Sequence, residues 1–206
     1  MTHRCGRESV VHLMDTSVSL LDSLRQPAVD GAWQQFVDLY SPLIRGWLRR
    51  NGAPLSDLDD VVQDVLTVVV RRFPEFRREP RTGAFRGWLR TITANCLRDH
   101  WRRMNRHPVA VGGTDFGRVI EQLADEHSGV SKMWDREHDE HVTQSLLKRI
   151  RAEFSEQTWY AFQRFALQGR SADEVAKELG MTTNAVFIAK SRVMSRLRKL
   201  GEGLID

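Results

Sequence analysis

The sequence has only two cysteines among its 206 residues, Cys5 and Cys96, and they lie far apart in different surroundings. Two cysteines cannot build a disulfide framework or a four-ligand zinc site. No apolar run approaches the roughly 20 residues that span a bilayer, and the first fifteen residues hold too short an apolar stretch for a secretory signal. We therefore expect a reduced, cytoplasmic, globular protein with no membrane insertion.

The alternation of apolar and polar residues that marks strands is also missing, whereas apolar residues recur at steps of three and four. This periodicity predicts an all-α fold with two small helical domains. A helical bundle is expected over residues 14–105 and a helix-turn-helix domain over residues 142–203. Between them, residues 106–141 interrupt the periodicity and are rich in acids, so they are expected to form a flexible acidic linker with at most one short helix. Met14 opens the first periodic segment and is a candidate translation start.

Three details of the bundle follow from local signals. Pro42 is expected to kink or divide the first long helix, because proline lacks the N–H that an interior position donates. Ser56 or Asp57 is expected to cap the helix that follows it. Two further helices are expected on either side of Asn95.

The net charge of the chain is +4, but the charged residues are unevenly distributed along it. Residues 71–106 carry eleven arginines against three acids, and residues 186–200 carry five bases and no acid. Residues 53–66 carry four aspartates and no base, and residues 115–141 carry eight acids against three bases. Two basic blocks separated by acidic stretches favour two surfaces that face a polyanion, with chance clustering of solvated charge as the alternative.

The sharpest local pattern lies near the C-terminus. Ser171 and Glu174 have the spacing of a capping box that opens a short helix. Ala176, Gly180 and Val186 then have the spacing of a helix-turn-helix, in which a small residue allows close approach, glycine makes the turn and an aliphatic residue fixes the second helix. The basic second helix favours DNA binding over an ordinary helical hairpin.

Two more segments carry polar patterns. Asp60, Gln63 and Asp64 line one side of a helix whose other side is rich in valine, a pattern that alone is more typical of a solvated face than of a binding site. Residues 83–103 read GAFRGWLRTITANCLRDHWRR and combine arginines with aromatic residues. Within them, Trp88 shares an apolar stripe and is expected to pack in the core.

Together and in this order, the three segments resemble the extracytoplasmic-function (ECF) subfamily of sigma-70 family RNA polymerase sigma factors. The resemblance covers about residues 31–103 and 142–200. It implies a transcription initiation factor that is not an enzyme and needs no cofactor. Core RNA polymerase and promoter DNA are the partners it implies, with an anti-sigma factor as a further class of partner.

The resemblance also implies three sets of functional side chains. One set would dock on the clamp helices of the polymerase: Asp60, Gln63 and Asp64. A second would act at the −10 element, with the first member in a loop that captures an extruded base: Asn95, Arg98, Asp99, Trp101 and Arg102. A third would dock on the −35 element, with the last two members on phosphates: Thr183, Asn184, Phe187, Lys190, Ser191, Arg192 and Arg196.

Other functions have weaker support. A helix-turn-helix regulator that is not a sigma factor would need neither the acidic stripe nor the basic aromatic segment. A nuclease would need clustered carboxylates, which Asp60 and Asp64 could only imitate. Residues 112–119 lack the lysine of a phosphate loop. His138 and His141 with Asp135 could touch a metal from one helix face, but no third, distant ligand is evident. No catalytic or metal-binding residue is therefore expected.

Overall fold

The computed structural model describes residues 19–26, 31–77, 83–104 and 113–205. Within these ranges the chain forms helices and no strand, which confirms the all-α prediction. The helices are α1 (Leu20–Leu24), α2 (Ala32–Arg50), η1 (Leu55–Asp57), α3 (Leu58–Arg72), η2 (Phe73–Glu75), α4 (Ala84–Met104), α5 (Gly113–Ala124), α6 (Gly129–Ile150), η3 (Arg151–Glu153), α7 (Glu156–Phe162), a π-helical turn η4 (Gln163–Leu167), α8 (Ala172–Leu179) and α9 (Thr183–Leu200). The candidate start at Met14 lies outside the described residues.

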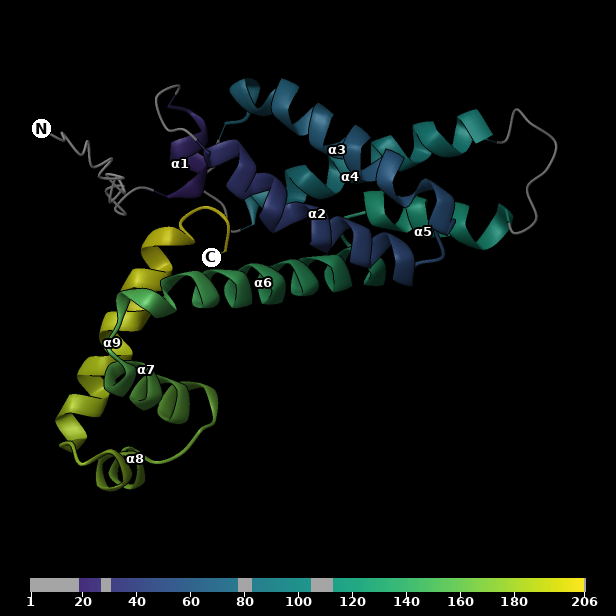
Figure 1. The fold of residues 1–206 in the computed structure, drawn as a ribbon. Helices are drawn as coiled ribbons and strands as arrows, with labels where there is room; N and C mark the ends of the chain where they lie inside the picture. The colour runs from purple at the N-terminus through teal and green to yellow at the C-terminus, as the bar shows by residue number, and fades with distance from the viewer. Residues whose placement is uncertain (1–18, 27–30, 78–82, 105–112, 206) are drawn as a thin grey trace, which may run out of the picture.

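Helices α2 to α5 gather into a bundle, and α6 runs along one side of it (Figure 1). An aromatic cluster fills the space between α2, η2 and α4. The ring of Phe85 lies edge-on to Phe36 (centroids 6.1 Å apart) and to Phe76 (5.6 Å). Trp88 lies 4.9 Å from Phe76 and is half-buried against the core, as its apolar stripe predicted. Edge-to-face contacts of this kind stabilise a core beyond the area that they bury.

Helix α2 runs unbroken through Pro42, so the predicted division is wrong. Phe36, Tyr40 and Ile44 bury one side of the helix on both sides of the proline. Pro42 is exposed, as is Asp38, whose carbonyl would accept a hydrogen bond from position 42. The lost bond therefore faces water, and apolar burial on the other side holds the helix together.

Helix α4 is also continuous, so the predicted break at Asn95 is wrong. Leu89, Ile92 and Leu97 form a buried stripe that continues across that position, while Asn95 itself is exposed. No glycine or proline interrupts the chain between Trp88 and the end of the helix. Burial of the stripe outweighs the low helix propensity of one asparagine.

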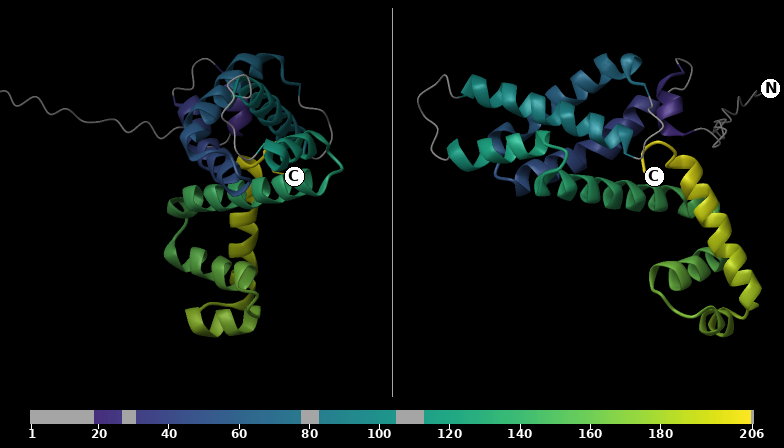
Figure 2. Two further views of the ribbon diagram at one scale, coloured as in Figure 1. Left: turned by 90° about the vertical axis from the view of Figure 1, so that its right-hand side faces the viewer. Right: turned by 180° about the vertical axis from the view of Figure 1, so that it is seen from behind.

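The predicted flexible linker is wrong for its described part, residues 113–141. Helix α5 packs on α4, and α6 packs on α2, α4 and α5, crossing the predicted boundary at residue 142 without a break. One face of α6 is buried at steps of four residues. These residues are Trp134, His138, Val142, Leu146 and Ile150. Figure 2 shows α6 lying along the bundle from two further directions; residues 106–112 of the predicted linker lie outside the described part.

Helix α9 joins the two halves of the molecule. Its N-terminal half packs with α7 and α8, and its C-terminal half packs on α6, where Val193, Leu197 and Leu200 belong to the same core as the bundle. The chain then turns back, and Leu204 is buried. The predicted C-terminal helices are therefore present, but they share a core with the N-terminal bundle.

Candidate nucleic-acid interface

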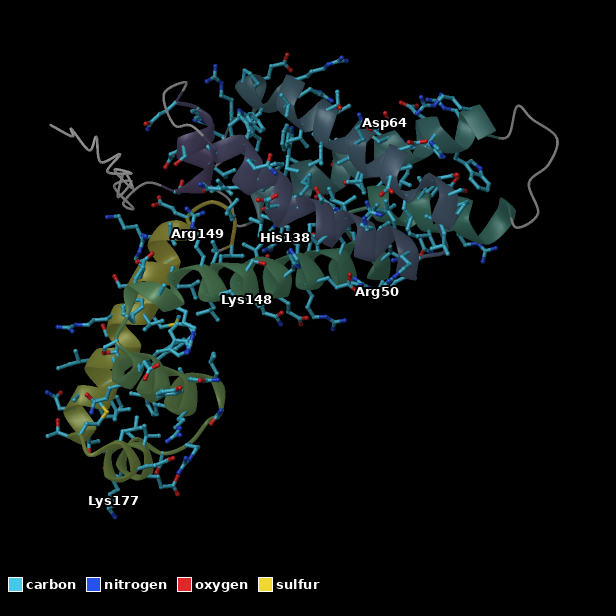
Figure 3. The ribbon with its side chains drawn as sticks, in the orientation of Figure 1. Arg50, Asp64, His138, Lys148, Arg149 and Lys177 are labelled. Carbon is cyan, nitrogen blue, oxygen red and sulfur yellow. The ribbon has the colours of Figure 1, made fainter. Side chains whose placement is uncertain are left out.

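The predicted polymerase-binding residues lie together on the outer side of α3. Asp60 and Gln63 are exposed and Asp64 is half-exposed, whereas Val61 and Val65 on the opposite side are buried. Figure 3 shows Asp64 on the side of the bundle that faces away from α6. The helix thus presents a polar stripe that the fold itself does not need for packing.

Asp57 begins α3, but its side chain does not cap the helix, so the predicted cap is wrong. Its Oδ2 instead lies 3.0 Å from Nε2 of His100 on α4, and its Oδ1 accepts a 2.7 Å hydrogen bond from Ser56. These bonds from Ser56 and His100 hold the pKa of Asp57 below its usual range. The carboxylate joins the start of α3 to α4.

Four of the five residues predicted to act at the −10 element form one stripe on α4, at steps of three and four. They are Asn95, Arg98, Asp99 and Arg102. The stripe is exposed apart from half-buried Arg98, whose guanidinium donates a 2.8 Å hydrogen bond to Oδ1 of Asn95, and Arg102 pairs with Asp99. Trp101 points elsewhere and packs half-buried against the core.

The predicted position of Asn95 therefore needs correction. It lies within α4, neither in a loop nor at a helix start. Because its amide is exposed, it can still contact another molecule, but no loop shapes a pocket around it. The loop position that the resemblance implied for Asn95 is therefore wrong, whereas its contact with an extruded base stays a prediction.

A groove between α3 and α4 connects the two predicted surfaces. Asp64 accepts a 2.8 Å hydrogen bond from Arg103, and Asp99 and Arg102 of the α4 stripe line the same groove. Cys96 lies at its base, free and buried, and burial raises the pKa of its thiol to about 11. The α3 and α4 stripes thus form one continuous face, although sequence reasoning treated them as separate.

Acidic residues of α6 neutralise part of the basic block on α4. Arg90 donates a 2.6 Å hydrogen bond to Asp135, and Arg86 donates a 2.7 Å bond to Asp139. Burial alone would raise the pKa of Asp139, but the hydrogen bond from His138 and the charge of Arg86 more than offset this and lower it. These two arginines serve the fold and are engaged within the chain.

His138 is completely buried between α6 and α2 (labelled in Figure 3). Its Nδ1 donates to Asp139 (3.0 Å), which leaves Nε2 to accept from the hydroxyl of Tyr40 (3.2 Å). Burial, and secondarily Asp139, raises the pKa of Tyr40 well above its usual value, so this hydroxyl stays a donor. His141 donates to the carbonyl of Leu39 (2.7 Å). Among the described residues, no three His, Cys, Asp or Glu side chains are placed to hold a metal ion.

The helix-turn-helix forms as predicted. Ser171 accepts from the backbone N–H of Glu174 (3.3 Å) at the start of α8, and Gly180 ends that helix with a left-handed φ of 62°. Ala176 of α8 and Val186 of α9 are both buried in the small core between these helices. Helix α9 then begins at Thr183, capped by the hydroxyl of Thr182.

The residues predicted to dock on the −35 element fall on different sides of α9. Asn184, Phe187, Lys190, Ser191 and Arg192 are exposed. Thr183 donates instead to Asp173 of α8 (2.8 Å). It therefore joins the two helices of the motif.

Arg196 departs from the predicted phosphate contact. Its Nε and one Nη bond to the two carboxylate oxygens of Glu153, at 2.5 and 2.9 Å, and only 14% of its side chain is exposed. A bidentate pair of this kind fixes the guanidinium plane. Arg196 therefore joins α9 to η3, and of the two arginines predicted to contact phosphates Arg192 is the exposed one.

Comparison with known families bears on the N-terminal half. Residues 36–107 match the family model described as sigma-70 region 2. The match supports a sigma-70 family sigma factor. It spans most of α2 together with α3 and α4, and thus the face formed by the two polar stripes. A sigma-70 region 2 implies binding of core RNA polymerase and promoter DNA.

A comparison with curated proteins found no significant match. In the described part of the chain, none of the helices has the length and apolar character to cross a membrane. The sigma-70 match ends before α6. The polar contacts that α6 makes with α2 and α4 were not predicted from the sequence. The signal for them was present: Trp134, Val142, Leu146 and Ile150 recur at multiples of four, and His138 occupies the missing step.

Proposed function

We propose that this protein is a sigma factor of the ECF subfamily, acting in the cytoplasm to direct core RNA polymerase to specific promoters and to help open the −10 DNA. The observation that carries the proposal is the order of two elements: a segment that matches sigma-70 region 2, followed by a formed helix-turn-helix on α8 and α9. A helix-turn-helix regulator would need only the second element. Membership of this subfamily would bring an anti-sigma factor as a further partner.

Binding to core polymerase is assigned to α3. Asp60 and Gln63 are exposed to a basic or amide-rich partner helix, and Asp64, which pairs with Arg103, lies beside them. A shallow groove next to these residues is lined by Val62, Leu66 and Val70. Val70 is 45% exposed, although valine is usually buried. A surface on which polar side chains lie next to exposed apolar side chains, as on α3, is typical of a protein interface.

Action on the −10 DNA is assigned to the α4 stripe. Arg98 is half-buried and Arg102 is exposed, and among the described residues they bond to neighbours on their own helix, Asn95 and Asp99. Surface pairs of this kind contribute little stability, so a phosphate can replace either carboxylate or amide at small cost. The groove shared with Asp64 joins the α4 stripe to the α3 stripe, which supports assigning the two roles to adjacent surfaces.

Run-off transcription with purified core polymerase on a promoter library tests the proposal. The wild-type chain should give specific transcripts, and Asp60→Lys/Asp64→Lys should abolish co-purification with core polymerase without unfolding. Glu121→Lys, an exposed site on α5, is the matched charge-reversal control. Absence of any chain-dependent transcript, or unchanged core binding by the double variant, contradicts the proposal.

A further inference from the structure

Two large apolar side chains are exposed at the N-terminal end of α9. Phe187 is 50% exposed and Ile188 is 44% exposed. Single exposed apolar residues are common on proteins, but this pair lies on the second helix of a helix-turn-helix, on the side opposite to buried Val186 and Ala189. That is the side that such a motif presents to the major groove of DNA.

The outward stripe at this end of α9 carries no charge. Asn184, Phe187, Ile188 and Ser191 follow one another at steps of three, one and three, which places them on one face. Arginine and lysine read guanine, asparagine reads adenine, and apolar side chains contact the C5-methyl group of thymine. This face therefore lacks the groups that read guanine and has the groups that fit A·T pairs.

Phe187 is held in place by a second ring. Its ring lies edge-on to Phe165 of η4, with centroids 5.3 Å apart and planes at 88°, and Nζ of Lys190 lies 5.3 Å from the centroid of Phe165. A side chain that is already ordered loses little freedom when it binds. Phe187 is thus presented as a fixed apolar surface, beside a cation that can reach the DNA backbone.

The charge around the pair fits DNA better than a protein partner. Residues 186–200 carry five bases and no acid, and Lys190 and Arg192 lie on either side of the outward stripe. A stable protein interface buries about 800 Å² on each partner, far more than two side chains supply. Two cations that flank a narrow uncharged stripe match two phosphate backbones that flank the edges of the bases.

We propose that Phe187 and Ile188 contact the methyl groups of thymines in the upstream promoter element, with Asn184 available to an adjacent adenine. The inference rests on the proposed function, because it requires the helix-turn-helix to bind duplex DNA. It goes further by naming what that helix selects: thymine methyl groups rather than guanine edges. The ligand class is duplex DNA with thymines at two adjacent steps of the major groove.

The test replaces thymine by deoxyuridine, which removes only the methyl group. The full chain with core polymerase first selects sites from random duplex DNA, and each selected thymine is then replaced singly. Wild-type affinity should fall about fourfold for each contacted methyl group, the effect of burying one such group. At the thymine that Phe187 contacts, Phe187→Ala should bind the two DNAs equally, and Phe187→Leu should keep part of the difference. Arg192→Ala, the control, should weaken binding to both DNAs by the same factor.

The possible outcomes distinguish a failure of methyl recognition from a failure of the proposed function. Selected sites bound equally well with thymine and deoxyuridine would overturn methyl recognition and leave the proposed function standing. Failure to select any sequence would overturn both. If the wild type selects sites that share no thymine, and Phe187→Ala binds those sites as the wild type does, the inference is overturned. The comparison of the two DNAs on wild-type protein decides even if a variant fails to fold.

Discussion

Arg90 of α4 and Asp135 of α6 form an ion pair of 2.6 Å between residues 45 positions apart, and only 8% of the arginine side chain is exposed. Asp135 belongs to the acidic stretch that the sequence suggested would be a solvated linker. The pair makes that stretch part of the fold, and it removes one arginine of the basic block from the exposed surface. Acidic composition alone therefore did not distinguish a linker from a helix that packs on a basic neighbour.

Arg90→Ala should destabilise the docking of α6, because it leaves the partly buried carboxylate of Asp135 without its donor. The expected loss is about 1–3 kcal/mol in the free energy of unfolding, measured by urea denaturation, with faster amide hydrogen exchange in α6. Arg102→Ala is the control, since Arg102 and Asp99 are both well exposed and such pairs contribute about 0–1 kcal/mol. Equal losses in the two variants would contradict the importance assigned to the Arg90 pair.

Stability should fall in acid through Asp57. Because its pKa is lowered in the folded state, its contribution is fully present above the unfolded pKa of about 3.9 and is lost as the pH falls through the folded pKa. Urea denaturation between about pH 5 and pH 2 should therefore show a steeper loss for the wild type than for Asp57→Asn. Asp60→Asn, at an exposed position of the same helix, should keep the steep wild-type profile. Parallel profiles for wild type and Asp57→Asn would remove this role.

Replacing Arg192 and replacing Arg196 by alanine should have different effects on thermal stability and on the salt dependence of DNA binding. Arg196→Ala breaks the bidentate pair with Glu153, so it should lower thermal stability and leave the salt dependence of DNA binding unchanged. Arg192→Ala should leave stability unchanged and reduce the slope of log affinity against log salt by about one. Fluorescence anisotropy over a salt series, together with thermal melts, measures both quantities. A reduced salt slope in Arg196→Ala would restore the phosphate contact that the sequence suggested.

Cys96 should be unreactive in the native protein. At pH 8 the raised pKa of about 11 leaves about 100-fold less thiolate than the ordinary value of 9.0 would, and the thiol is also buried. In a Cys5→Ser background, labelling by a chromogenic disulfide reagent should be slow and should accelerate in urea. Rapid labelling of the native protein would show that the groove between α3 and α4 opens to its base.

Features set by local signals could be predicted from the sequence, whereas features set by distant partners could not. The capping serine at Ser171, the turn at Gly180 and the polar stripe of α3 depend on residues within one or two turns, and each was found. The cap at Asp57 failed because His100 competes for the carboxylate. The pairing of Arg196 with Glu153, 43 residues away, could not be predicted from the sequence near Arg196.

The predicted linker failed for a related reason. A buried histidine broke the apolar repeat of α6, and it can be buried only because Tyr40 and Asp139 satisfy its two nitrogens. The predicted break at Asn95 and the division at Pro42 failed because each residue faces solvent while the opposite side of its helix is buried. Sequence periodicity records which residues are apolar, but it does not record which polar residues have found partners.

Helix α9 has a consequence for promoter geometry. The helix has 18 residues, is about 27 Å long and contains no glycine or proline. Its N-terminal end carries the uncharged outward stripe, and its C-terminal end is buried against α6. Along a duplex, each added base pair moves a site by about 3.4 Å and turns it by about 35°. Under the proposed function, and with the C-terminal end of α9 packed on α6, one spacer length would bring the upstream element to Phe187 while the downstream element meets α4. A spacer one base pair longer would turn the upstream element away from Phe187.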